Sequence, residues 1–185
     1  MKRKYESMAT ADSAKLKAED TPSLHELHKS MVTVHVGEQR HQFLIHRELL
    51  CHHSSFFRAT FQGSFSEAAS GNVELPDDDV DVFKIFESWL YTGSVGLMNN
   101  VAGQQPSKLV KLYILADKIE IPAIQKETLD VIRERAVQNL DLCDPDTIHL
   151  AFENTPPGSS LRRLLVDVFA YNANPESWQE DFLQL

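Results

Sequence analysis

Histidine, cysteine and serine side chains crowd into residues 46–55, where they could bind zinc or supply a thiol nucleophile with a histidine base. Zinc ligands on one helix usually stand four positions apart. Cys51, His52 and His53 are consecutive, so on a helix they point about 100° apart and cannot converge on one ion. Cys143 lies far along the chain, and the sequence identifies no base for a Cys51 thiolate. We therefore predict no metal or catalytic site here and a buried, inert Cys51.

A second candidate is a calcium loop, because Asp77, Asp79 and Asp81 have the spacing that opens one. Such a loop also needs glycine at its sixth position and a bidentate glutamate at its twelfth, where this chain has Val82 and Ser88. Carboxylates just before a helix instead cap its free N–H groups and favour the positive end of its dipole. The aspartates therefore predict a helix start and no cation site.

Charge and composition exclude several kinds of partner. The 185 residues carry a net charge of −9, and residues 1–20 hold five basic and four acidic side chains, so the excess of acid lies in the rest. An acidic body opposes binding to phosphates, and no nucleic-acid partner is expected. No apolar run approaches the roughly 18 residues of a membrane span, and no secretory signal is visible. We expect an intracellular protein of the nucleus or cytoplasm with free thiols and, lacking a glycine-rich phosphate loop, no cofactor.

The elements that position the histidine cluster begin with a hairpin. Residues 32–36 alternate valine with polar residues, Gly37 supplies a turn, and a second extended run covers 41–46. Alternation of β-branched residues around such a turn is typical of a β-hairpin. His35 and His41 take outward positions in this alternation.

Helices dominate the rest of the chain. Ser54 or Ser55 is expected to cap the second of two short helices, and the apolar stripes of 80–91 predict the central core helix. Asp144 is expected to cap a later helix. In order, the predictions are a disordered tail at 1–22, helices at 47–51 and 54–62, a Gly/Ser loop at 63–71, a strand at 73–75, a helix at 80–91, a loop at 94–107, and helices near 109–116, 121–132 and beyond 140.

Six motif-like blocks follow one another along the chain. They are FLIHRELL (43–50), SSFFRATF (54–61), FSE (65–67), VELPD (73–77), Phe83 with WLYTG (89–93), and LYILADKIEIP (112–122). In this order they resemble the signature of the BTB/POZ family, whose fold-signature residues are here His46, Arg47, Leu50, Phe57, Phe61, Tyr91 and Gly93. The resemblance implies an α+β fold in which a small β-sheet is flanked by a cluster of α-helices, with the domain at 23–135 and a helical extension at 136–185. The flanks, including 171–176, resemble stand-alone BTB proteins of filamentous fungi.

The resemblance implies a protein-interaction module and not an enzyme. BTB domains associate with themselves, and many bridge a cullin to a ubiquitylation substrate. The F-x-E motif contacts cullin in such adaptors, so Phe65 and Glu67 inherit that role as a hypothesis. An exposed phenylalanine beside a carboxylate is compatible with it, since apolar anchors and charge complementarity favour binding. Alternatively, Phe65 packs under its own loop, and the chain is a self-associating scaffold or a transcriptional co-regulator.

One departure from the family concerns self-association. Members that dimerise tightly often carry an aspartate at the start of the first strand, paired with the basic residue after the signature histidine. Here Arg47 is present, but Met31 stands at the aspartate position. The charged pair is incomplete, which argues against a domain-swapped homodimer. In an adaptor of this kind, substrate recognition would fall to the tail or to the helices after about residue 140.

Overall fold

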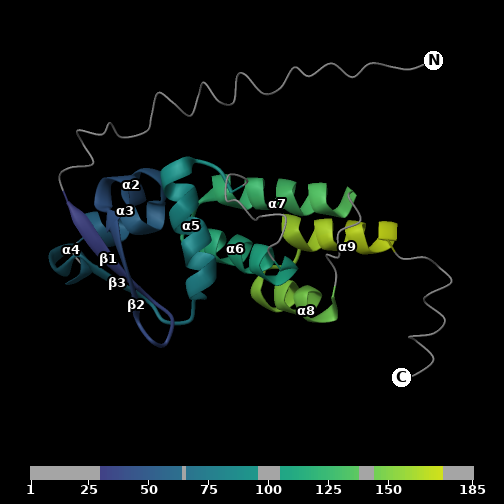
Figure 1. Ribbon diagram of the computed structural model, residues 1–185, viewed down its shortest axis with the longest axis horizontal. Coiled ribbons are helices and arrows are strands. Elements are labelled where there is room, and N and C mark those ends of the chain that lie inside the picture. The colour runs from purple at the N-terminus through teal and green to yellow at the C-terminus, as the bar shows by residue number, and fades with distance from the viewer. Residues whose placement is uncertain (1–29, 64–65, 96–104, 138–143, 173–185) are drawn as a thin grey trace, which may run out of the picture.

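The structure is a computed structural model that describes residues 30–63, 66–95, 105–137 and 144–172. A three-stranded sheet stands at one end, and the helices of residues 106–172, labelled α6 to α9, lie side by side at the other, as Figure 1 shows. Strand β1 (Met31–Val36) is central in the order β2-β1-β3. It pairs antiparallel with β2 (His41–His46) and parallel with β3 (Asn72–Leu75). This arrangement confirms the α+β fold class, with a small sheet flanked by helices.

The hairpin alternation places one side chain differently from its prediction. His41 is exposed as expected, and the register puts His35 on the outward positions between Gln42 and Glu74. Yet His35 is only 9% exposed, and its Nδ1 has no hydrogen-bond partner among the described residues. The Arg40 side chain reaches from the turn to the Glu74 carboxylate at 2.5 Å, beside His35. The prediction of an outward His35 was therefore wrong as to burial, because alternation assigns a face but not what covers it.

Two short helices follow the hairpin directly and meet at Ser54. Helix α2 spans Arg47–His53 and α3 spans Ser55–Gln62, so the consecutive Cys51, His52 and His53 form the last turn of α2. Ser54 is the cap of α3: its Oγ accepts a hydrogen bond from the Phe57 N–H at 3.0 Å. The same Oγ donates to the Ile119 carbonyl at 2.6 Å. One buried hydroxyl thus fixes the corner and holds it against the end of α6.

The segment predicted as a Gly/Ser loop at 63–71 contains a helix. Helix α4 (Ser66–Ser70) is five residues long, and the Gly71 N–H donates to the Glu67 carbonyl at 2.8 Å. Gly71 ends the turn with φ of 67°, a left-handed conformation that glycine adopts at no steric cost. The loop prediction was wrong here, since so short a helix carries too little apolar periodicity to be seen in the sequence.

Helix α5 (Val80–Thr92) is the centre of the core, as its apolar stripes predicted. Asp79 caps it, with Oδ1 accepting from the N–H groups of Asp81 and Val82 at 2.9 and 3.3 Å. Gly93, with φ of 71°, ends it. Six of its side chains are buried, and its two phenylalanines join an aromatic cluster with rings from β2 and α3. The buried residues are Val82, Phe83, Ile85, Phe86, Trp89 and Leu90, and the cluster adds Phe43, Phe57 and Phe61.

The remaining helices continue the same core. They are α6 (Pro106–Lys118), α7 (Pro122–Val137), α8 (Pro145–Asn154) and α9 (Ser160–Asn172). Helix α8 packs on α6 and α9 packs on α7, and Leu161 and Leu165 belong to the same buried cluster as Phe86. Asp144 caps α8 as predicted, accepting from the Thr147 N–H at 2.8 Å. In the part of the chain that is described, none of the helices has the length and apolarity to cross a membrane.

Candidate functional site

Cys51 and His53 of α2 take part in the packing of the fold. Cys51 is buried, its Sγ lies 3.7 Å from the Phe57 carbonyl, and burial raises the pKa of its thiol. A thiol whose pKa is raised is a poor nucleophile at neutral pH. The His53 ring packs edge-on to Trp89, with centroids 5.1 Å apart. Within the described ranges, no three histidine, cysteine or acidic side chains are grouped so that they could hold a metal.

Two signature residues, His46 and Tyr91, meet at the end of the sheet. The His46 Nδ1 and the Tyr91 hydroxyl are 2.9 Å apart, and the rings pack edge-on. The His46 N–H also donates to this hydroxyl at 3.4 Å. This contact joins the end of β2 to the last turn of α5. His46 and Tyr91, which lie in separate signature blocks, therefore meet in one structural junction.

Arg47 is bound inside the fold. Its guanidinium donates to the Phe61 carbonyl in the last turn of α3 and lies 5.8 Å above the Phe61 ring. A cation at this place is favourable because it offsets the negative end of the helix dipole. Met31, at the position where the family's aspartate was expected, is 43% exposed. The arginine therefore joins the start of α2 to the end of α3, and the position on strand β1 expected for its acidic partner holds the uncharged Met31.

The F-x-E motif is described in part. Phe65 lies outside the described residues, whereas Glu67 lies on α4 and is half-buried. Glu67 lines a hollow of about 460 Å³ whose walls come from α3, α4 and β3. Phe56 and Thr60 contribute from α3, and Glu74, which pairs with Arg40, contributes from β3. The lining therefore includes two carboxylates, those of Glu67 and Glu74, and one aromatic side chain, that of Phe56.

Sequence reasoning missed Phe56 as part of this surface. Phe56 is half-buried against the core, with its ring 5.1 Å from that of Phe57. Phe57 and Phe61 form the buried stripe of α3, and Phe56 lies one position off that stripe. The available signal was a third aromatic residue outside the buried face of a short amphipathic helix.

Comparison with known proteins agrees with this architecture. A sequence model of the BTB/POZ domain matches residues 24–136, more than half of the chain. The chain belongs to the BTB/POZ family. BTB/POZ domains are protein-interaction modules, so the family places this protein among those that bind other proteins.

Individual relatives of this BTB/POZ chain come from plants and mouse. Armadillo BTB Arabidopsis protein 1 of Arabidopsis thaliana is 27% identical over 123 residues, 66% of this chain and 15% of that protein. Arm repeat protein interacting with ABF2, also of Arabidopsis thaliana, is 35% identical over 60 residues, 32% of this chain and 8% of that protein. TD and POZ domain-containing protein 3 of Mus musculus is 38% identical over 53 residues, 29% of this chain and 14% of that protein. The chain thus spans between 8 and 15% of the length of these curated relatives.

Proposed function

We propose that this BTB/POZ protein is a non-catalytic adaptor that links a cullin scaffold to a second protein, with Phe65 and Glu67 contacting the cullin. The observation that supports this is that Glu67 and Phe56 line the same hollow. An apolar anchor beside a carboxylate is the combination from which interface hot spots are built. Phe65, two positions before Glu67, enters the proposal from the sequence alone.

The test is calorimetric titration of the full chain with the purified N-terminal domain of a cullin. Glu67→Ala and Phe65→Ala are each expected to weaken binding by about 1–3 kcal/mol, the scale of interface hot spots. Glu134→Ala is the control, because Glu134 is exposed on α7, a helix that contributes nothing to the hollow. Unchanged affinity in both test variants contradicts the assigned site. Failure of the wild-type chain to bind the cullin domain contradicts the cullin role.

The second candidate is a self-associating scaffold or transcriptional co-regulator without ligase work. Two exposed apolar side chains support it: Leu44 is 62% exposed and Met31 is 43% exposed. The register of β1 and β2 puts both on the outward face of the sheet, diagonally across from each other. Light scattering that finds a stable oligomer of a chain without cullin affinity favours this role. Leu44→Asp would then disperse the oligomer if the sheet face is its interface.

The remaining assignments belong to the adaptor proposal. We assign residues 23–135 to the BTB/POZ domain and 136–185 to a helical extension that recognises the substrate, in a protein of the nucleus or cytoplasm. The segment 171–176 links the chain to the stand-alone BTB proteins of fungi. Affinity purification with mass spectrometry, using wild type and Phe65→Ala, separates partners that depend on the cullin from those that bind elsewhere. Recovery of the same partners by both proteins contradicts the adaptor role.

A further inference from the structure

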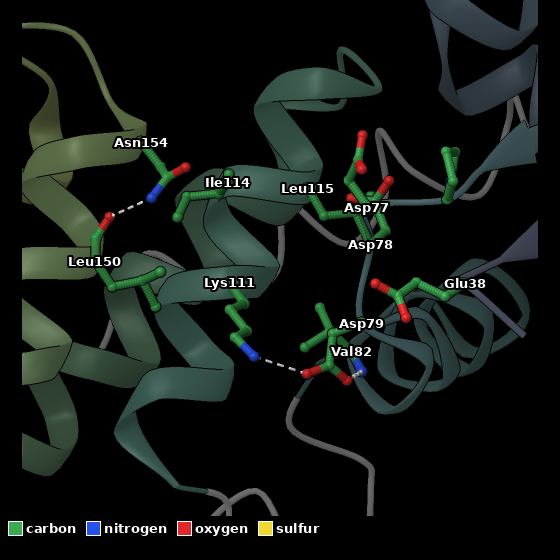
Figure 2. A pocket seen from close by; sticks show the side chains of 12 residues that line it. Glu38, Asp77, Asp78, Asp79, Val82, Lys111, Ile114, Leu115, Leu150 and Asn154 are labelled. Carbon is green, nitrogen blue, oxygen red and sulfur yellow. Dashed lines mark hydrogen bonds and ion pairs between the residues drawn. The ribbon is translucent and has the colours of Figure 1, made fainter.

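A cleft of about 520 Å³ lies between the hairpin turn, the loop before α5, and helices α6 and α8. Figure 2 shows its carboxylates on one side and apolar side chains from α6 and α8 on the other. Its volume falls within the range of ligand pockets in proteins. Pro76, Asp77, Ile114 and Leu115 of its lining belong to BTB/POZ signature blocks, but neither Phe65 nor Glu67 of the F-x-E motif lines it.

Close backbone packing builds the carboxylate wall. The N–H groups of Gly37 and Asp78 both donate to the Leu75 carbonyl, at 2.9 and 3.4 Å. Gly37 has φ of 74°, and a Cβ there would stand 3.2 Å from a methyl group of Val80 and 3.5 Å from the Asp78 carbonyl. The hairpin turn and the loop before α5 are therefore held in direct contact, which sets Glu38 beside the aspartates.

Two of the aspartates are neutralised from helix α6. The Lys118 ammonium lies 2.7 Å from Asp78 Oδ2, and the Lys111 ammonium lies 2.8 Å from Asp79 Oδ2. The second of these pairs is drawn in Figure 2. These ion pairs join the loop before α5 to α6 and offset the negative charges of both carboxylates.

Glu38 and Asp77 have no cationic partner among the described residues. Both side chains are exposed, and neither forms an ion pair there. The wall therefore presents two carboxylates that no described cation offsets. The described residues include no three-ligand group suited to a metal ion, so an organic cation fits this wall better than a metal does.

The opposite wall is apolar. Ile114 of α6 and Leu150 of α8 are half-buried and turn toward the cleft, and the buried Leu115 of α6 also lines it. A ligand that fills the cleft would therefore cover apolar surface on one side while it meets the carboxylates on the other. Burial of apolar surface supplies affinity, and the charges set orientation.

We propose that this cleft is a docking site for an extended segment of a partner protein that carries an arginine or lysine next to an apolar side chain. The cation pairs with Glu38 and Asp77, and the apolar side chain covers Ile114 and Leu150. Charge complementarity favours another protein over a second copy, because this acidic chain has already paired many of its own described cations. These include Arg40, Lys84, Lys108, Lys111 and Lys118.

The probe is a phage-displayed library of random twelve-residue peptides selected on the immobilised full chain. Enriched peptides are synthesised, and their affinities are measured by fluorescence polarisation. We expect them to share a basic residue beside an apolar one and to bind the double variant Glu38→Gln, Asp77→Asn about tenfold more weakly. The matched control is Glu134→Gln, Asp167→Asn, which removes two exposed carboxylates outside the cleft and should leave affinity unchanged.

A second variant tests the apolar wall without changing charge. Leu150→Ala should weaken the same peptides several-fold while their salt dependence stays that of the wild type. Three outcomes overturn the proposal: no peptide is enriched, the enriched peptides lack a basic residue, or the charge variant and its control bind equally well. None of these outcomes depends on whether the chain binds a cullin.

Discussion

The indole Nε1 of Trp89 donates a 2.9 Å hydrogen bond to the carboxylate of Glu127, which is 38 positions further along the chain. The other oxygen of Glu127 accepts from the Ser94 hydroxyl at 2.9 Å and from the Val95 N–H at 2.8 Å. One half-buried carboxylate on α7 thereby accepts hydrogen bonds from the core tryptophan of α5 and from the two residues that follow the end of that helix at Gly93. It connects the part of the fold around the sheet to the long helices.

Glu127→Ala should lower the free energy of unfolding by about 2 kcal/mol, because hydrogen bonds to a charged acceptor are among the stronger ones and three donors lose theirs. Chemical denaturation followed by tryptophan fluorescence measures the change. Glu134→Ala, an exposed position on the same helix, should change stability by less than about 0.5 kcal/mol. Equal stability of the two variants would show that Glu127 does not hold α7 to α5.

Phe57→Ala should cost about 3–5 kcal/mol of stability, since the ring is fully buried and its removal leaves a cavity. The neighbouring Phe56→Ala is a matched comparison, because Phe56 is only half-buried and should cost about 1–2 kcal/mol. Urea denaturation gives both values. A loss below about 1 kcal/mol for Phe57 would place α3 outside the core.

Arg47→Ala should cost about 1–2 kcal/mol, because the guanidinium bonds the last turn of α3 and lies over the Phe61 ring. Arg47→Lys keeps the charge at the helix end but loses the planar contact, so its loss should be smaller. Thermal unfolding of wild type, Arg47→Lys and Arg47→Ala ranks the three proteins by stability. If the alanine variant is as stable as the wild type, this contact between the start of α2 and the end of α3 contributes nothing to stability.

Asp79 makes stability depend on pH. Partial burial would raise the pKa of its carboxyl, but hydrogen bonds from Lys111 and from the Val82 N–H lower that pKa overall. A depressed folded-state pKa stabilises the protein above the unfolded value of about 3.9, and the effect disappears as pH falls through the folded pKa.

Asp79→Asn keeps a capping side chain and removes the charge, so it should lower stability at pH 7 by at most about 1 kcal/mol for this partly exposed pair. The difference from wild type should shrink as the pH falls below about 4. Denaturant titrations at a series of pH values measure it. A difference that is constant with pH would mean that the ion pair with Lys111 has no part in it.

Local signals explain most of what the sequence predicted correctly. The alternation at 32–36 and the apolar stripes of 80–91 depend on the periods of strand and helix, and both elements were found where expected. Asp79 and Asp144 cap their helices because a carboxylate before a helix start acts on its nearest N–H groups. Ser54 was one of two predicted caps, and the structure selects it.

Features that depend on distant contacts were missed. His35 is buried although the register puts it on the outward positions, and alternation encodes a face but not what covers it. The hollow beside Glu67 needs α3, α4 and β3 together. The roles of Phe65 and Glu67 remain predictions. The acidic cleft needs α8 against α6, and no motif marks that packing in advance.

The parallel pairing of β3 with β1 has a kinetic consequence. The hairpin partners are joined by a tight turn, whereas α2, α3 and α4 lie between β1 and β3 in the sequence. Loop closure over such a distance is entropically costly, so non-local pairing is slow. During refolding, amide protons shared by β1 and β2 should gain protection before those of β3, which pulse-labelled hydrogen exchange can resolve. Simultaneous protection of all three strands would mean that the sheet and its crossover helices form in a single step.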